Sequence, residues 1–155
     1  MVHSTEYKRG GQRSWRKSPP GRGPSFVVED EDPLRLAVVK GLQKRGFAVL
    51  EACDGPAALD LIRSDANEID AALLDVMLRG MSSREIFEET RRLRPCVNVI
   101  LTSAYSEETV EASFGGLRIE RFIRKPFHLA DRPILSACLR TLYHDKFGVL
   151  LLGVD

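Results

Sequence analysis

The sequence predicts an α/β fold in which a doubly wound, five-stranded parallel sheet carries helices on both faces. From Ser25 onward, short β-rich apolar runs alternate with longer segments of helical period. Most of the short runs are continuously apolar, which is typical of parallel strands covered on both faces. Strict alternation of strands and helices forms right-handed crossovers in one open sheet. With 155 residues, 43% of them hydrophobic, the chain can form one core and is too short for a second large domain.

Five apolar runs are the predicted strands. They are bounded by turn residues and by helical segments rather than by one another, as a parallel arrangement requires. In chain order the predicted strands are Phe26–Glu29, Phe47–Glu51, Ala71–Asp75, Val97–Thr102 and Ile119–Ile123.

The first two predicted helices follow the first two strands. Asp32 as N-cap and Pro33 at the first helical position begin one helix, and Gly46 ends it. The second opens after Asp54-Gly55 with Pro56 in its first turn. Apolar residues at helical spacing give each a buried face: Leu34, Val38 and Leu42 in the first, and Ala57, Ala58, Leu61 and Ile62 in the second.

Three further helices complete the predicted pattern. The third begins at Ser82, which has capping-box spacing to Glu85, and ends before Pro95. The fourth is capped by Ser106 and broken by Gly115-Gly116. Apolar faces are again expected: Ile86, Thr90 and Leu93 in the third, Val110 and Phe114 in the fourth, and Leu135, Cys138, Leu139 and Leu142 in the fifth.

Composition divides the chain into three parts: a flexible basic arm (1–24), a folded domain (25–143) and a short tail (144–155). Residues 1–24 hold six of the 23 basic residues and one of the 22 acidic residues, so the remainder has a net charge of −4. The arm is rich in Gly, Ser, Pro, Arg and Lys and cannot bury enough apolar surface to order itself. The tail is too short for a helix-turn-helix or enzymatic output module.

The sequence lacks the features of a membrane-spanning protein, of a secreted protein and of a zinc- or disulfide-stabilised domain. No apolar run is long enough to span a bilayer, and no apolar segment follows the basic N-terminus as in a secretory signal. The three cysteines, Cys53, Cys96 and Cys138, have neither zinc-site nor disulfide-framework spacing, and we expect buried free thiols in a reducing cytoplasm.

Polar residues stand at the ends of four predicted strands. Glu29 and Asp30 end the first strand, Asp75 the third and Thr102 the fourth, and Lys125 follows the fifth. Because ligands of open α/β sheets bind outside the carboxyl ends of the strands, these side chains should share one rim. Each alone has a structural explanation: acidic residues favour a helix N-terminus, and a lone Asp often forms a turn. Their coincidence in one sheet favours a site.

Such a set suits a hard divalent cation and a phosphoryl group. Clustered carboxylates need a cation, and oxygen ligands suit Mg²⁺. An ionised Asp75 can then attack phosphorus to form an acyl phosphate. Lys125 would offset charge on the phosphoryl oxygens, and Thr102 would donate a hydrogen bond.

At these residues the chain resembles the receiver domains of two-component response regulators, of which the single-domain chemotaxis regulator is the simplest form. Four motifs carry the resemblance in the right order: FVVEDED (Phe26–Asp32), AALLDVMLRGMS (Ala71–Ser82), VILTSAY (Val99–Tyr105) and FIRKPF (Phe122–Phe127). The resemblance covers about residues 26–143 and implies a flavodoxin-like sheet with strand order 2-1-3-4-5.

The resemblance also implies roles for individual residues. Asp75 would be phosphorylated, Thr102 and Lys125 would contact the phosphoryl group, and Phe122 would be the switch aromatic, although an ordinary core position explains Phe122 equally well. The implied Mg²⁺ site consists of Asp30, Asp75 and the main-chain carbonyl of Met77, with Glu29 acting through a water. The Lys125–Pro126 bond is expected to be cis, as is usual in the family.

The sequence departs from the family pattern at several positions. Glu29 stands where Asp is common, and its extra methylene could change how the water shell of the cation is held. Arg79 and Ser83 stand where Pro and Gly are frequent, so the loop after Asp75 could differ in shape. Gly115-Gly116 is atypical for a segment on the output face.

The sequence therefore predicts a cytoplasmic phosphoacceptor that is not an enzyme and receives its phosphoryl group from a histidine kinase or phosphotransfer protein. A protein target and a possible homodimer are expected, and nucleic acid and membrane binding are not. The alternatives are a degenerate receiver used only for binding, or the receiver portion of a hybrid histidine kinase. A magnesium-dependent phosphatase is disfavoured because Met77 occupies the place of its second, acid/base Asp.

Overall fold

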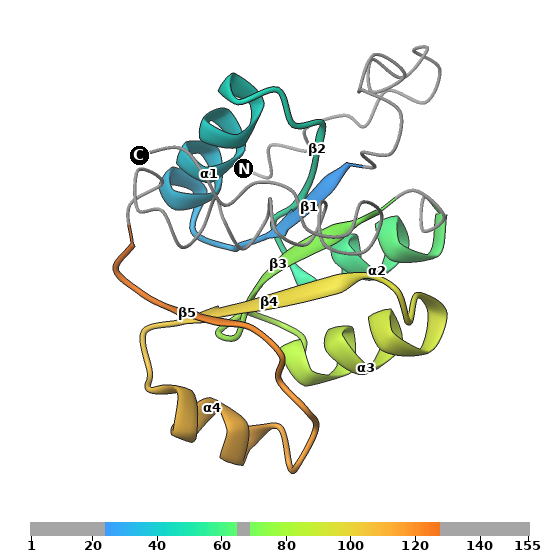
Figure 1. Cartoon of the computed structure of the whole chain (residues 1–155), viewed down its shortest axis with the longest axis vertical. Helices are drawn as coiled ribbons and strands as arrows, with labels where there is room; N and C mark the ends of the chain where they lie inside the picture. The colour runs from blue at the N-terminus through green and yellow to red at the C-terminus, as the bar shows by residue number, and fades with distance from the viewer. Residues whose placement is uncertain (1–23, 65–68, 128–155) are drawn as a thin grey trace, which may run out of the picture.

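The computed structural model describes residues 24–64 and 69–127, which form one parallel sheet flanked by helices (Figure 1). The sheet has the order β2-β1-β3-β4-β5, which confirms the predicted fold class and strand order. Its strands are β1 (Ser25–Val28), β2 (Val49–Ala52), β3 (Ala71–Asp75), β4 (Asn98–Ser103) and β5 (Phe122–Arg124). The helices are α1 (Asp32–Lys44), α2 (Gly55–Ser64), α3 (Ser83–Leu93) and α4 (Glu107–Ser113).

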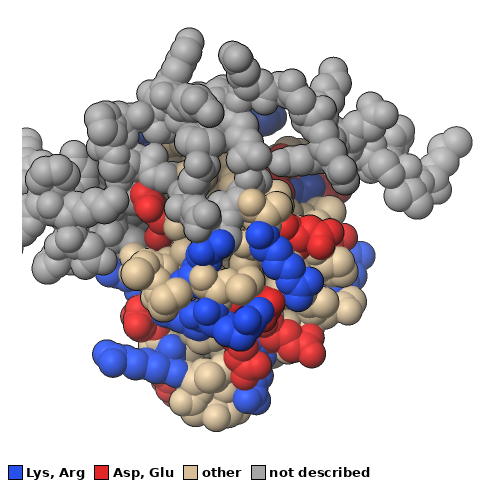
Figure 2. All heavy atoms as spheres, turned by 90° about the vertical axis from the view of Figure 1, so that its right-hand side faces the viewer, with Lys and Arg blue, Asp and Glu red and all other residues tan. Residues whose placement is uncertain are grey.

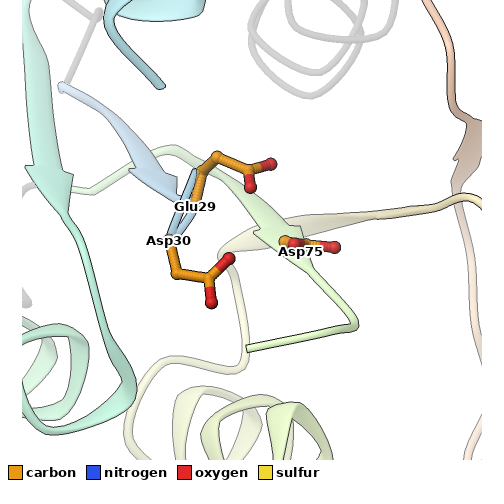
Figure 3. A group of neighbouring side chains, drawn as sticks. All are labelled: Glu29, Asp30 and Asp75. Carbon is orange, nitrogen blue, oxygen red and sulfur yellow. The ribbon is translucent and has the colours of Figure 1, made fainter. Parts of the chain in front are cut away.

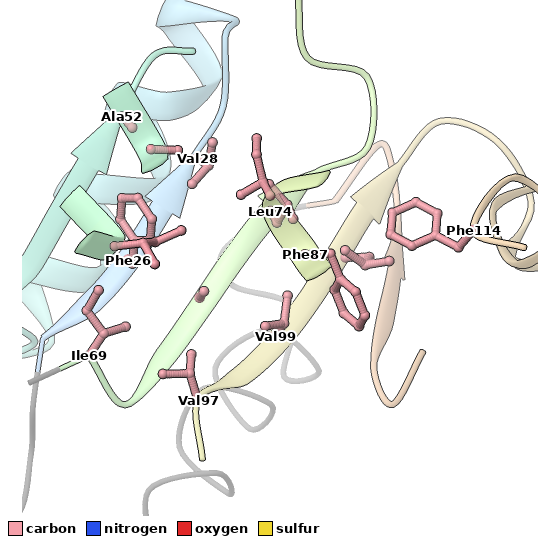
Figure 4. Packing of buried hydrophobic residues seen from close by; sticks show 14 of the residues in the cluster. Phe26, Val28, Ala52, Ile69, Leu74, Phe87, Val97, Val99 and Phe114 are labelled. Atoms are coloured by element: carbon pink, nitrogen blue, oxygen red, sulfur yellow. The ribbon is translucent and has the colours of Figure 1, made fainter. Parts of the chain in front are cut away.

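The two faces of the sheet are covered by different helices. Alternate strand residues point to opposite faces. On one face Val27, Leu73 and Ile100 pack with the apolar stripe of α1. On the other, Val28 and Leu74 belong to the larger cluster shown in Figure 4, which includes residues of α2, α3 and α4. Within it the rings of Phe87 and Phe114 meet edge to face, 5.6 Å apart.

Four of the five predicted strands have shifted bounds: β1 and β4 are shifted by one residue, and β2 and β5 by more. Phe47 lies before β2 because its N–H donates to the carbonyl of Leu42 and closes the turn after α1. Its buried ring packs on the α1 side of the sheet, which explains the apolar signal there. Ile119 likewise precedes β5 and packs against the larger cluster, so its apolar character reflects burial and not strand pairing.

The helices begin close to the predicted positions, but two of the predicted N-terminal caps do not form as expected. The N-cap of α1 is Glu31 and not Asp32, and Pro33 lies in the first turn. Ser82 is the N-cap of α3 but accepts no side-chain hydrogen bond, so a capping box does not form. The hydroxyl of Ser106 does accept from the N–H of Thr109, as expected for the cap of α4.

A further cap and the cysteines differ from expectation. The Oδ1 of Asp54 accepts from the N–H of Ala57 at 2.8 Å, a cap that the sequence did not single out. Cys53 and Cys96 are free thiols as expected, but they are exposed and not buried. Cys53 follows β2 and Cys96 precedes β4. Their chain neighbours Ala52 and Val97 are the buried residues there.

Some predicted features lie outside the described residues. These are the basic arm up to residue 23, the fifth helix with Cys138, and the tail. The helices in the described residues include no candidate membrane span.

Charges of both signs are interspersed on the face formed by the right-hand side of Figure 1, where α2 and α3 lie (Figure 2). Arg63 of α2 and Arg92 of α3 both form ion pairs with Glu89, at 3.3 and 2.9 Å. Hydrogen bonds from Arg92 and Arg63 lower the pKa of Glu89 to about 2. This pairing connects two helices that also share the larger apolar cluster.

The packing of α1 predicts a large difference between two of its leucines. Leu42 is 1% exposed and Leu36 is 44% exposed. We expect Leu42→Ala to lower the free energy of unfolding by about 2–5 kcal/mol because it leaves a cavity. Leu36→Ala, with the same change in helix propensity, should cost less than about 1 kcal/mol. Urea unfolding measures both, and equal losses would contradict the assignment of the buried face.

Candidate functional site

Strand register brings the predicted site residues to the carboxyl edge of the sheet. Asp75, the last residue of β3, is the register partner of Thr102 in β4. Both have the same parity as Leu73 and Ile100, so they lie on the α1 side of the sheet. Glu29 follows β1 directly, and the N–H of Lys125, just after β5, donates to the carbonyl of Ser103 in β4 at 2.7 Å. Four strands therefore contribute to one site.

Three carboxylates converge there. Glu29, Asp30 and Asp75 each offer an oxygen atom, and these atoms lie within 4.8 Å of one another (Figure 3). Glu29 and Asp75 are almost fully buried, at 4% and 3% exposure. Like charges this close repel strongly where water is scarce, so the group needs nearby cations.

Lys125 supplies one of these cations. Its Nζ lies 2.8 Å from Oε2 of Glu29 and 3.1 Å from Oδ2 of Asp75. Burial disfavours the charged ammonium, but the hydrogen bond to Glu29 and the charge of Asp75 outweigh it. The pKa of Lys125 is consequently raised above its ordinary value. The Lys125–Pro126 bond is cis, as expected from the resemblance.

Glu29 responds differently to the same surroundings. Burial raises the pKa of the Glu29 carboxyl, and the neighbouring charge of Asp75 adds to this effect. The hydrogen bond from Lys125 and the N–H of Glu31, which donates to Oε1 at 3.2 Å, act in the opposite direction but do not cancel it. Burial and the charge of Asp75 therefore oppose the ionisation of Glu29.

The loop after β3 holds the backbone of Asp75 in place. The Ser83 hydroxyl lies 2.7 Å from the carbonyls of both Asp75 and Val76, and the N–H of Val76 donates to the carbonyl of Thr102. The N–H of Met77 donates to Oδ1 of Asp75 at 3.1 Å. One oxygen of Asp75 thus contacts Met77 and the other contacts Lys125.

Arg79, in the same loop, contacts the remaining carboxylate. Its backbone N–H and its Nε–H both donate to Oδ2 of Asp30, at 3.2 and 2.9 Å. In the sequence, Arg79 stood out only as a departure from the family pattern, and nothing indicated its partner Asp30, 49 residues away. Ser83 stood out in the same way, and its contacts with the carbonyls of Asp75 and Val76 were not predicted.

The donor set fits Mg²⁺. Carboxylate oxygens of Asp30 and Asp75 are hard ligands, and Mg²⁺ binds to few protein groups while retaining water. Met77 is 55% exposed, so it lies at the open side of the loop. Two monovalent cations, from Lys125 and Arg79, accompany the three carboxylates in the described structure.

The other two predicted residues have less distinctive surroundings. Thr102 is 1% exposed and stands beside Asp75 through the register of β3 and β4. Phe122 begins β5 opposite Leu101 and is half-buried against the larger apolar cluster. Its position suits a core aromatic and a switch residue equally.

Fold and site together define a receiver domain, and the family model described as "Response regulator receiver domain" matches residues 26–134. The chain belongs to this family and is a receiver domain of two-component signalling. Its relatives include the sensor kinase CckA of Brucella abortus, 33% identical over 115 residues, which are 70% of this chain and 12% of that protein. The sensory transduction protein RegX3 of Mycobacterium tuberculosis is 35% identical over 102 residues, 66% of this chain and 44% of that protein. The chain thus spans less than half the length of either relative.

Solved structures agree with this assignment. The receiver domain of the hybrid histidine kinase CckA has a TM-score of 0.64 at 27% identity, covering 78% of this chain and all of that one. A CheY-like receiver domain protein from Methanospirillum hungatei has a TM-score of 0.65 at 23% identity, covering 78% of this chain and 94% of that one, and supports the fold.

The surroundings of Glu29 generate a prediction about pH. In the presence of EDTA, we expect carbon-13 NMR to show the Glu29 carboxyl titrating above its ordinary value of 4.5. Asp75→Asn should lower this pKa by removing repulsion, and Lys125→Gln should raise it by removing the positive charge that stabilises the ionised carboxylate.

The same shift determines a trend in stability. Because the native pKa is raised, the stabilisation from protonated Glu29 is complete below pH 4.5 and is lost as pH rises through the native pKa. Wild type should therefore lose stability relative to Glu29→Gln as pH rises above 4.5. A native pKa at or below 4.5 would contradict the role given to burial.

Proposed function

We propose that Asp75 is the phosphoacceptor of this receiver domain and that Mg²⁺ is held by Asp30, Asp75 and the main-chain carbonyl of Met77, with Glu29 acting through a water. The observation that carries the proposal is the position of Lys125, whose Nζ contacts both Glu29 and Asp75. A lysine bridging two buried carboxylates can instead contact a phosphoryl oxygen once one is attached to Asp75.

In the proposed reaction, a carboxylate oxygen of Asp75 attacks the phosphorus of a phosphohistidine. A new phosphorus–oxygen bond forms, and the phosphorus–nitrogen bond breaks with its electron pair passing to the imidazole. The attacking group is already ionised, so no general base is required. Bound Mg²⁺ would neutralise charge on the transferring phosphoryl group.

The chain's own residues orient this step. The N–H of Met77 and the Nζ of Lys125 fix the carboxylate of Asp75 from two sides. The Thr102 hydroxyl is proposed to donate to a phosphoryl oxygen, since Thr102 adjoins Asp75 in the sheet. Movement of Thr102 would open space for Phe122, which would bias a two-state equilibrium of the α4–β5 face.

The proposed donor is a histidine kinase or a histidine phosphotransfer protein, and the proposed output is a contact with another protein or a second copy. We propose a cytoplasmic location, which suits the exposed thiols of Cys53 and Cys96. The resemblance to CckA, a sensor kinase, supports origin in a hybrid kinase as a second candidate. Turnover as a phosphatase is not proposed, because Met77 offers no acid/base carboxyl.

A phosphate-affinity gel after incubation with acetyl phosphate and Mg²⁺ tests the phosphoacceptor. We expect a shifted band for wild type and for Asp60→Asn, an exposed Asp on α2. Asp75→Asn should give no shift, and EDTA should abolish the wild-type shift. Lys125→Gln should slow phosphorylation by on the order of 100-fold, because it removes a preorganised cation.

Two results would contradict the proposal. A shift retained in Asp75→Asn would move the acceptor to another residue. No shift with acetyl phosphate or with a phosphorylated histidine phosphotransfer protein, in folded wild type that binds Mg²⁺, would favour a receiver used only for binding.

A further inference from the structure

Arg79 contacts one carboxylate oxygen, Oδ2, of Asp30, which is a residue of the proposed Mg²⁺ site. Its backbone N–H and its Nε–H both donate to Oδ2, and Nη2 lies 3.5 Å from the Asp30 carbonyl. The same carboxylate belongs to the three-carboxylate group whose oxygens lie within 4.8 Å of one another. The guanidinium therefore partly fills the electrostatic role of a metal ion.

The two cations of the site divide the carboxylates between them. Lys125 contacts Glu29 and Asp75, and Arg79 contacts Asp30. Lys125 is largely buried, with 16% of its side chain exposed, whereas the Arg79 side chain is 85% exposed. Arg79 can thus leave for water at little cost, while Asp30, 15% exposed, stays at the site.

We propose that Arg79 is a displaceable internal cation that competes with Mg²⁺ for Asp30 and so sets the Mg²⁺ affinity of the receiver. The inference rests on the proposed Mg²⁺ site and concerns its regulation. The backbone N–H of Arg79 would hold the loop near Asp30 whichever residue stands at this position, and only the guanidinium is exchanged.

The charge of Arg79 acts in the same direction as its hydrogen bond. A positive charge beside the site repels a divalent cation, and the bond to Oδ2 must break before that oxygen can be a ligand. Both effects are moderate because Arg79 is exposed, which limits the expected change in affinity to about two- to fivefold.

Isothermal titration of the full-length protein with MgCl₂ tests this inference without measuring phosphorylation. We expect Arg79→Gln to bind Mg²⁺ about two- to fivefold more tightly than wild type. Arg79→Lys, which keeps the charge but not the Nε geometry, should fall between the two. Arg92→Gln is the matched control: it removes an exposed guanidinium from an ion pair on α3 and should leave the affinity unchanged.

The outcomes separate this inference from the proposed function. Tighter binding in Arg79→Gln alone supports it. The inference is overturned if Arg79→Gln binds Mg²⁺ no more tightly than wild type does. If wild type binds Mg²⁺ and Asp30→Asn does not, the proposed Mg²⁺ site still stands. Absence of Mg²⁺ binding in wild type and in Arg79→Gln overturns both.

Discussion

The bridge from Lys125 to Glu29 and Asp75 is the interaction on which the site depends. Two unit charges 4 Å apart interact by roughly 4 kcal/mol at an effective dielectric constant of 20, and a domain is stable by only about 5–15 kcal/mol. Two nearly buried carboxylates and a third beside them would therefore consume much of that stability without cations. Lys125, and at the rim Arg79, provide the compensation that allows such a group to exist.

The parallel sheet fixes the positions of these charged groups. Parallel register aligns Asp75 with Thr102 and places Lys125 against the end of β4. The contacts of Ser83 with the carbonyls of Asp75 and Val76 then fix the loop that begins at Asp75. Apolar clusters on both faces keep these strand ends in place, so the carboxylate of Asp75 is held by the core of the domain.

The strands, the helices and five of the site residues could be predicted because each leaves a local signal, whereas the strand order came from the resemblance to receiver domains. Continuous apolar runs indicated the strands, and polar residues at or just after their ends indicated the site: Glu29, Asp30, Asp75, Thr102 and Lys125. Contacts between distant segments leave no such signal. Arg79 was visible only as an unusual residue, since its bond to Asp30 depends on how the β3–α3 loop lies against the segment that follows β1. Likewise, Ile119 and Phe47 resembled strand residues because burial and strand pairing select the same side chains.

The most direct test of the central claim is a crystal structure with Mg²⁺ and beryllium trifluoride, which mimics a phosphoryl group on a carboxylate. We expect the fluoride group on Asp75, with Lys125 Nζ within hydrogen-bond distance of a fluorine and with Mg²⁺ bound by Asp30, Asp75 and the carbonyl of Met77. Beryllium trifluoride bound at another carboxylate would contradict the account. So would a Lys125 that still contacts only Glu29 and Asp75 when beryllium trifluoride is bound to Asp75.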